Sequence, residues 1–272
     1  MHLKSYIGLL AGAGELPLVF IQEVKKRGKK VVVTGIKNVT SNELEKFVNE
    51  INWVELNDVD KCLDFFCQKR ISEVIILGKF DKALMFKYED KFESFKKLLF
   101  RLPDTQDLSF FKYFLSQEAE KRGLNIVSPS IYLSDLLVKE DELINCSVEK
   151  KGLEDVRYGW QVAKKLASMD IGQTVVIKNL TVLAVEAIEG TDRTILRGGA
   201  LGGEGTVVVK VARPKQDMRF DIPVVGPKTL INMARVKSKL LAIEKEKVFL
   251  LYKSKVLNIA KENQISILGI GG

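Results

Sequence analysis

The N-terminal segment, residues 6–36, places the strongest constraint on the fold. An apolar run leads into a turn that contains Gly12 and Gly14, a helix is expected over residues 17–27, and a β-branched strand over residues 30–36. A strand, a helix and a second strand joined so closely form a βαβ unit, whose strands are parallel and whose crossover is right-handed. The sequence therefore predicts an α/β protein that begins with a parallel sheet.

The glycine turn matches only part of the dinucleotide-binding fingerprint. Residues 12–17 read GAGELP, with proline at the end of the motif, and no acidic residue follows the second strand where a ribose would need one. The glycines either let the turn pass tightly between strand and helix or offer backbone N–H groups to an anion or nucleotide at the helix N-terminus. An NAD site is not expected.

A second candidate anion contact follows the strand expected over residues 73–77, which ends in Gly78 and Lys79. Open parallel sheets bind ligands at the carboxyl ends of their strands. Lys79 is therefore either a phosphate contact or a solvated lysine in a turn.

The length of 272 residues favours two domains, which we place at residues 1–133 and 134–272. The glycine-rich stretch 198–205 suggests a mobile flap or an undemanding connection. The other elements expected are helices over residues 42–51, 59–69, 106–121, 154–167 and 228–242, and strands over residues 124–127, 170–177, 180–188, 206–211, 247–251 and 264–268.

The composition excludes several kinds of active site. The one histidine is His2, so a Ser-His-Asp triad, a Cys-His pair, an HExxH zinc site and a histidine general base are not expected. Catalysis would have to use carboxylates, lysine, arginine or a metal with oxygen ligands. The three cysteines form no CxxC pair and fit a reducing cytoplasm. The net charge of +8 suits an anionic membrane, a phosphorylated substrate or nucleic acid.

Residues 170–223 mix carboxylates with cations at unusual density. Oxygen ligands from two chain segments, beside guanidinium groups, would suit a divalent cation and a phosphate together. A sheet edge with solvated ion pairs would give the same composition. The acids are Glu186, Glu189, Asp192, Asp217 and Asp221, and the cations are Arg193, Arg197, Lys210, Arg213 and Arg219.

Four stretches, GLLAGAGELP, DIGQTVVI, LAVEAIEGTD and KVARPKQDMRFDIPVVGPKT, resemble the LpxI-type UDP-2,3-diacylglucosamine pyrophosphatases. The resemblance covers nearly the whole chain, and its C-terminal motifs are the more specific. It implies an N-terminal Rossmann-like domain and a C-terminal catalytic α/β domain, with the lipid held between them. It also implies hydrolysis of UDP-2,3-diacylglucosamine to UMP and 2,3-diacylglucosamine 1-phosphate (lipid X), a step of lipid A synthesis in Gram-negative bacteria that needs Mg²⁺ or Mn²⁺.

The same resemblance implies roles for individual residues. It makes Asp217 the essential aspartate, and Arg213 stands where the family usually has lysine, which keeps the charge but changes the donor geometry. Together with the residue patterns above, this gives three sets of expected site residues. The expected catalytic residues are Asp217, Asp221 and Arg219. The expected metal ligands are Asp217 and the two acids Glu189 and Asp192, which are three residues apart at the exit of an expected strand. The expected substrate contacts are Gly12, Gly14, Lys79, Arg197, Lys210 and Gln216.

The alternative function is a non-catalytic binder of a nucleotide or phospholipid, whose acids only form ion pairs. The apolar run at the N-terminus is too short for a membrane-spanning helix and lacks the cleavage pattern of a signal peptide. We therefore expect a cytoplasmic protein that visits the anionic inner leaflet of the inner membrane, does not bind nucleic acid, and has a homodimer as an open possibility.

Overall fold

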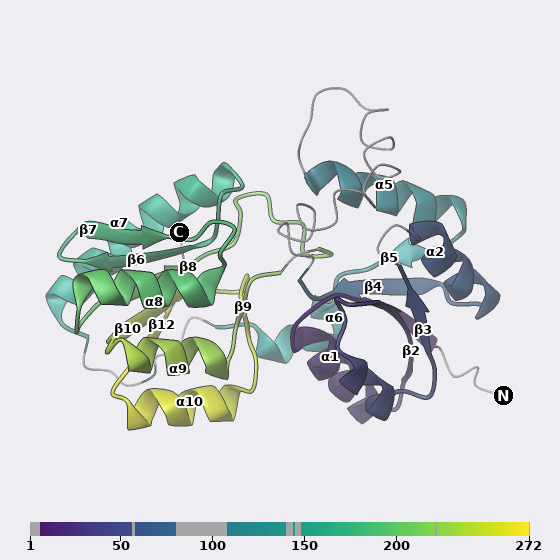
Figure 1. Ribbon diagram of the computed structural model, residues 1–272, viewed down its shortest axis with the longest axis horizontal. Helices are drawn as coiled ribbons and strands as arrows, with labels where there is room; N and C mark the ends of the chain where they lie inside the picture. The colour runs from purple at the N-terminus through teal and green to yellow at the C-terminus, as the bar shows by residue number, and fades with distance from the viewer. Residues whose placement is uncertain are drawn as a thin grey trace. The chain divides into compact units, whose positions relative to one another are not determined.

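The computed structural model describes residues 6–55, 58–79, 108–139, 144, 148–220 and 222–271. The chain forms two compact units. Unit 1 comprises Met1–Leu133 and the short stretch Met218–Asp221, and unit 2 comprises Ser134–Asp217 and Ile222–Gly272. Most elements of both are labelled in Figure 1.

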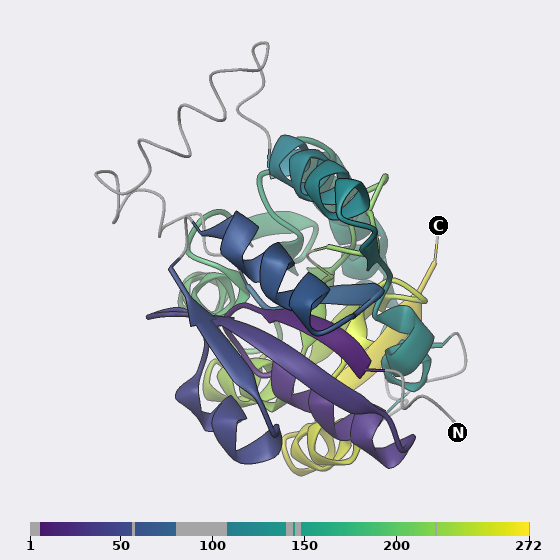
Figure 2. The same ribbon diagram turned by 90° about the vertical axis from the view of Figure 1, so that its right-hand side faces the viewer.

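Unit 1 contains a five-stranded sheet in the order β3-β2-β1-β4-β5, and every neighbouring pair is parallel. The direction of winding reverses between β1 and β4. Helix α1 lies on one face, and α2 and α5 lie on the other (Figures 1 and 2). The bounds are β1 Tyr6–Ala11, α1 Leu16–Lys26, β2 Lys30–Ile36, the 3₁₀ helix η1 Asn42–Phe47, β3 Ile51–Val54, α2 Val59–Gln68, β4 Glu73–Leu77, α5 Leu108–Lys121, β5 Asn125–Ile126 and α6 Ser130–Leu133.

The sheet of unit 1 is buried on both faces, as its nearly continuous apolar strands require. Helix α1 buries Phe20 and Val24, and the opposite face carries a cluster that includes Leu10 and Phe66. Phe220, from the short stretch of unit 1 that comes late in the sequence, belongs to the same cluster. The predicted parallel α/β architecture is confirmed.

Unit 2 contains a second five-stranded sheet, in the order β12-β10-β8-β6-β7. Strands β12, β10 and β8 are parallel, β6 is antiparallel to β8, and β7 is antiparallel to β6. Helix α7 covers one face, and α8, α9 and α10 cover the other (Figure 1). The bounds are η3 Ser134–Leu136, α7 Lys150–Ser168, β6 Thr174–Lys178, β7 Thr181–Val185, α8 Thr191–Gly202, β8 Val207–Lys210, β9 Val224–Val225, α9 Pro227–Arg235, β10 Leu240–Glu244, β11 Phe249–Leu250, α10 Lys253–Glu262 and β12 Ser266–Ile270.

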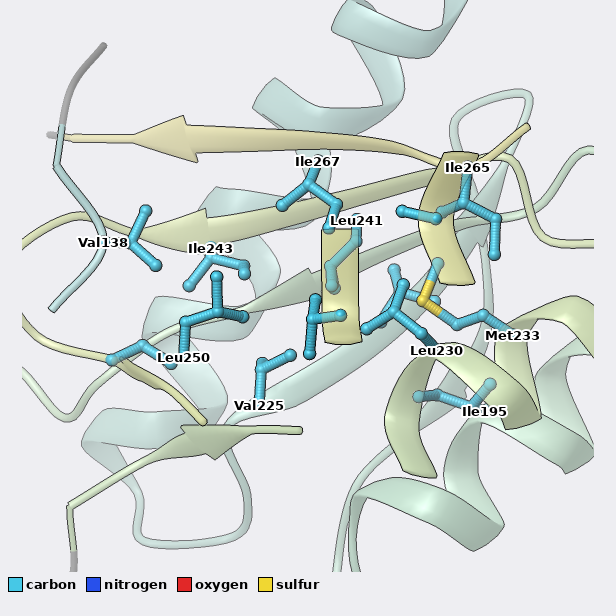
Figure 3. Close-up of a cluster of buried hydrophobic side chains, with 14 of the residues drawn as sticks. Val138, Ile195, Val225, Leu230, Met233, Leu241, Ile243, Leu250, Ile265 and Ile267 are labelled. Atoms are coloured by element: carbon cyan, nitrogen blue, oxygen red, sulfur yellow. The ribbon is translucent and has the colours of Figure 1, made fainter. Parts of the chain in front are cut away.

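Alternate residues of the strands in unit 2 pack on opposite faces. On β6, Val175 and Ile177 join the cluster under α7, whereas Val176 joins the cluster under α8 and α9. The second cluster includes Ile195 from α8 and Met233 from α9 (Figure 3). Each fully buried apolar side chain of this size stabilises the fold by about 1.5–3 kcal/mol relative to exposure.

The glycine-rich stretch 198–205 is not a flap, because most of it belongs to helix α8. A Cβ added at Gly198 would lie 2.6 Å from Cβ of Val176 on β6, and one at Gly199 would lie 2.3 Å from Cβ of Val236. The glycines therefore let α8 lie close against its neighbours, and this tertiary packing overrides their low helix propensity. The prediction of a loop was wrong.

The helix predicted over residues 228–242 is also wrong in its second half. Helix α9 ends at Arg235, and Lys237 has a left-handed backbone with φ of 53°. Strand β10, Leu240–Glu244, then pairs with both β8 and β12. In unit 1, the helix predicted over residues 42–51 is a shorter 3₁₀ helix that ends at Phe47, before β3.

Candidate functional site

In unit 1, Gly12 and Lys79 lie together at the carboxyl ends of β1 and β4. The amide of Gly12 donates to the Leu77 carbonyl at 2.7 Å, and Ala13 and Lys79 exchange two backbone hydrogen bonds at 3.0 and 2.8 Å. Gly78 has a φ of 106°, and a Cβ there would lie 2.6 Å from the carbonyl carbon of Gly12. Only glycine lets the two strand exits approach so closely. This is the place where the winding reverses and where open sheets bind ligands.

Gly14 follows in the same turn, just before α1. Its φ is 96°, and no heavy atom lies within 4 Å of the position that a Cβ would occupy. The turn therefore needs glycine here for its backbone conformation. Three of the predicted substrate contacts, Gly12, Gly14 and Lys79, thus share one edge of the sheet of unit 1.

The stretch Met218–Phe220 also belongs to unit 1. Ser128, two residues beyond β5, donates its hydroxyl to the Met218 carbonyl at 3.0 Å, and Phe220 is 4% exposed. The Arg219 guanidinium carbon lies 5.4 Å from the centre of the Phe220 ring, a distance typical of a cation–π contact. Arg219 is therefore carried by unit 1, whereas Asp217 groups with unit 2. Asp221 lies outside the described residues.

In unit 2, a row of polar side chains runs across the ends of three neighbouring strands, β7, β6 and β8. Thr174 at the start of β6 is the register partner of Lys210 at the end of β8, and the amide of Glu186, just past β7, donates to the Thr174 carbonyl at 2.8 Å. Thr191, the first residue of α8, lies over this row. The Lys210 ammonium, in a residue only 5% exposed, donates to Oγ1 of Thr191 at 2.6 Å and to Oγ1 of Thr174 at 3.2 Å.

Glu186 completes this polar row. Its carboxylate accepts hydrogen bonds from the Thr191 hydroxyl at 2.8 Å and from the Gln173 amide at 3.3 Å. Burial alone would raise the pKa of Glu186. The charge of Lys210, together with hydrogen bonds from Thr174, Thr191 and Gln173, outweighs burial and leaves the pKa of Glu186 below its ordinary value. The row therefore holds an ionised carboxylate, fixed hydroxyls and a buried cation.

The start of the C-terminal motif is attached to the same edge of unit 2. Nε of Arg213 donates to Asp170 at 2.6 Å, and the side-chain amide of Gln173 donates to Gln216 at 3.3 Å. At the end of β10, Glu244 accepts a hydrogen bond from the Ala212 amide at 2.8 Å. These contacts direct the chain as it leaves β8 toward Asp217.

The predicted metal ligands Glu189 and Asp192 each form an ion pair. Glu189 lies 2.6 Å from Arg197, and Asp192 lies 3.0 Å from Lys228. Burial opposes ionisation of Glu189, but the Arg197 hydrogen bond and backbone N–H groups leave its pKa below the ordinary value. Within the described ranges, no three carboxylate, histidine or cysteine side chains are grouped closely enough to hold a metal ion. The set Asp217, Glu189 and Asp192 is therefore not brought together there.

The predicted substrate contact Arg197 also has partners of its own. Besides its ion pair with Glu189, it donates to the Val185 carbonyl at 2.9 Å. It therefore ties the middle of α8 to the end of β7.

Sequence reasoning missed the partners of Lys210. Thr174 and Thr191 were not among the predicted site residues, and Glu186 was named only as one of several acids. The available signal was their position in the sequence, because all three lie inside DIGQTVVI or LAVEAIEGTD, two of the stretches that carry the family resemblance. Their convergence depends on the pairing of β7, β6 and β8.

Comparison with known proteins places the chain. The LpxI N-terminal domain matches residues 6–136, and the LpxI C-terminal domain matches residues 139–268. The chain belongs to the LpxI family. A relative from Caulobacter vibrioides (strain ATCC 19089 / CIP 103742 / CB 15), named UDP-2,3-diacylglucosamine pyrophosphatase LpxI, is 23% identical over 275 residues, which cover 97% of each chain.

Solved structures similar to parts of the chain include biotin carboxylases. The complex from Campylobacter jejuni is 11% identical and covers 72% of this chain and 41% of its own, with a TM-score of 0.29. The biotin carboxylase domain of a single-chain bacterial carboxylase is 13% identical and covers 68% of this chain and 38% of its own, also with a TM-score of 0.29. At these scores the likeness carries no argument about fold or function.

Proposed function

We propose that this LpxI family member hydrolyses UDP-2,3-diacylglucosamine to UMP and 2,3-diacylglucosamine 1-phosphate, lipid X, in lipid A synthesis. Family membership and the name of the Caulobacter relative support the substrate. The observation that carries the chemistry is the buried Lys210 ammonium, fixed by Thr174 and Thr191 at a strand end of unit 2. A cation that is already held in place before the substrate binds can stabilise the negative charge of a reacting diphosphate.

The reaction consumes one water. A water oxygen bonds to one phosphorus, the bond from that phosphorus to the bridging oxygen breaks, and the two products share the released proton with the solvent. Negative charge shifts onto the leaving phosphate, so a fixed cation that meets it lowers the barrier. We assign this role to Lys210 and Arg219, with Asp217 and Asp221 as the catalytic carboxylates.

We further expect the reaction to need Mg²⁺ or Mn²⁺. Mg²⁺ is usually held by one or two protein carboxylates together with substrate phosphates. We propose Asp217 as a ligand because of its place in the most specific motif of the family. Glu189 and Asp192, the other expected ligands, each pair with a cation in the structure. When bound, such a metal would neutralise phosphate charge.

The remaining predicted contacts are assigned to substrate binding. In unit 1, the Gly12–Gly14 turn and Lys79 suit a nucleotide or phosphate at the carboxyl edge of the sheet. In unit 2, Gln216 lies on the segment that follows Lys210, and Arg197 lies on α8, the helix that begins with Thr191.

The lipid substrate also implies a membrane surface as a partner. None of the helices in the described ranges is both long and apolar enough to cross a bilayer. We propose that the protein is cytoplasmic and reaches the anionic inner leaflet through its net charge of +8.

One assay tests the proposal. The purified protein is incubated with UDP-2,3-diacylglucosamine and Mg²⁺, with and without EDTA, and UMP and lipid X are measured. We expect equal amounts of both products, and none with EDTA. Binding of the substrate without formation of UMP, with either Mg²⁺ or Mn²⁺, would instead indicate a non-catalytic binding protein. Full turnover in EDTA would contradict the metal requirement alone.

A further inference from the structure

The C-terminal motif passes from one unit to the other and back within a few residues. The chain belongs to unit 2 up to Asp217, to unit 1 over Met218–Asp221, and to unit 2 again from Ile222. Asp217 and Arg219, two of the residues proposed to act in hydrolysis, are therefore assigned to different units although only Met218 separates them. What holds this stretch in unit 1 decides where its side chains can be.

Two described contacts attach the stretch to unit 1. Phe220 is 4% exposed and is part of the apolar cluster that contains Leu10, Phe66 and Ile76 from β1, α2 and β4. Ser128 donates its hydroxyl to the Met218 carbonyl at 3.0 Å. One contact buries a side chain and the other fixes a carbonyl two residues earlier, so together they define both the position and the direction of the backbone.

The attachment restricts the neighbouring charged groups. Arg219 precedes the buried ring directly, and its guanidinium lies over that ring at 5.4 Å. Asp217 is three residues from Phe220, so their Cα atoms lie within about 11 Å of each other whatever the loop conformation. A displacement of Phe220 therefore moves the backbone of Arg219, its direct neighbour, and pulls on the short link of two residues that joins it to Asp217.

We propose that Phe220 is a positioning residue for the hydrolysis proposed above, acting through Arg219 and Asp217 by its burial in unit 1. The proposal rests on the proposed function. It differs from a purely structural role of Phe220, because a core residue without this task would affect stability and leave turnover by the folded protein intact.

The test compares Phe220→Ala with Phe66→Ala, which removes a fully buried ring of the same cluster on helix α2, far from the motif in sequence. Both variants should lower the melting temperature. Only Phe220→Ala should lower kcat of the folded fraction, by about 10²-fold, because small misplacements of reacting groups have effects of this size. We expect KM to change by less than about threefold. Phe220→Leu, which keeps an apolar anchor, should restore kcat to within about tenfold of the wild type.

A second pair of variants leaves the core intact and covers the case in which Phe220→Ala does not fold. Ser128→Ala removes the hydrogen bond to Met218. Ser130→Ala removes the neighbouring hydroxyl, which lies 3.1 Å from that of Ser128, without touching Met218. We expect kcat to fall by about fivefold in the first variant and to stay unchanged in the second, since one neutral hydrogen bond is worth about that factor.

Hydrogen exchange supplies a readout without turnover. Amides of residues 216–220 should exchange at least about tenfold faster in Phe220→Ala than in Phe66→Ala if Phe220 anchors this stretch. Equal exchange, or equal kcat in the two alanine variants and in the two serine variants, would overturn the positioning role. A wild-type protein that forms no UMP would instead overturn the proposed function, so the two failures are distinguishable.

Discussion

Replacement of Lys210 by methionine removes a buried charge from unit 2 with little change in side-chain shape. The ammonium donates to Thr191 and Thr174 and supplies the charge that lowers the pKa of Glu186. Without it, two hydroxyls lose a partner and the half-buried Glu186 carboxylate loses its compensating charge. A buried polar group left without its partner costs about 1–3 kcal/mol. We expect Lys210→Met to be destabilised by that amount at pH 7.

The loss of stability should depend on pH with a definite sign. The pKa of Glu186 in the folded protein lies below its ordinary value of 4.5, so its ionised form stabilises the fold above that pH, and this contribution is lost as the pH falls through the folded pKa. Lys210→Met removes the charge that lowers this pKa. The difference in free energy of unfolding between the wild type and the variant should therefore be largest near neutral pH and shrink below pH 4.5.

Turnover is the decisive readout. If Lys210 meets the phosphate charge that develops during hydrolysis, Lys210→Met should lower kcat by about 10²–10³-fold, as loss of other fixed electrostatic groups does. The matched control is Lys178→Met, because Lys178 also donates two hydrogen bonds, to the Gly202 and Glu204 carbonyls at 2.7 and 2.8 Å, at the opposite edge of the same sheet. The control should keep its kcat. Folded Lys210→Met with kcat within about threefold of the control would refute the assignment.

Two further predictions concern the architecture of unit 1. Gly78→Ala should destabilise the protein by at least about 2 kcal/mol, because it combines left-handed backbone strain with a close contact against Gly12. Chemical denaturation should show a smaller loss of stability for Gly123→Ala, where φ is 72° but no heavy atom lies within 4 Å of the added Cβ. Equal losses in the two variants would contradict the close approach of β1 and β4. Burial raises the pKa of the Cys62 thiol to about 12, so iodoacetamide at pH 8 should label Cys62 only after unfolding, as peptide mass spectrometry can check; rapid labelling of Cys62 in the folded protein would contradict its burial.

Local patterns in the sequence were sufficient for the first βαβ unit. The turn glycines, Pro17 at the start of the helix and the apolar run of β2 all lie within the segment that they specify, and β2 has the bounds that its residues predict. Helix α8 could not be predicted in this way. Glycines usually indicate a loop, and only the nearness of Val176 and Val236 explains why they are needed within a helix.

Strand β10 was missed because neither glycine nor proline separates it from α9. The apolar residues Leu240–Ile243 continue a helical stripe equally well, and only pairing with β8 and β12 selects the strand. The same limit applies to the candidate site. The charge of Lys210 was visible in the sequence, but its contacts with Thr174 and Thr191 follow from strand register.

The spacing of Glu189 and Asp192 suggested a shared metal site for a similar reason. Three-residue spacing places acids near one another, but it does not reveal the cations that each will meet. Lys228, the partner of Asp192, lies on α9, whose packing against α8 is a tertiary feature. The pairing of each carboxylate with a cation is therefore a feature that the spacing alone could not predict.

The most direct test of the account is UMP release by Asp217→Ala, measured beside its melting temperature on the same preparation. Asp217 is the aspartate that the LpxI resemblance makes essential, and loss of such a group should lower turnover by at least about 10²-fold. We predict that loss at a melting temperature close to that of the wild type. A folded Asp217→Ala protein that releases UMP at a rate near that of the wild type would contradict the central claim.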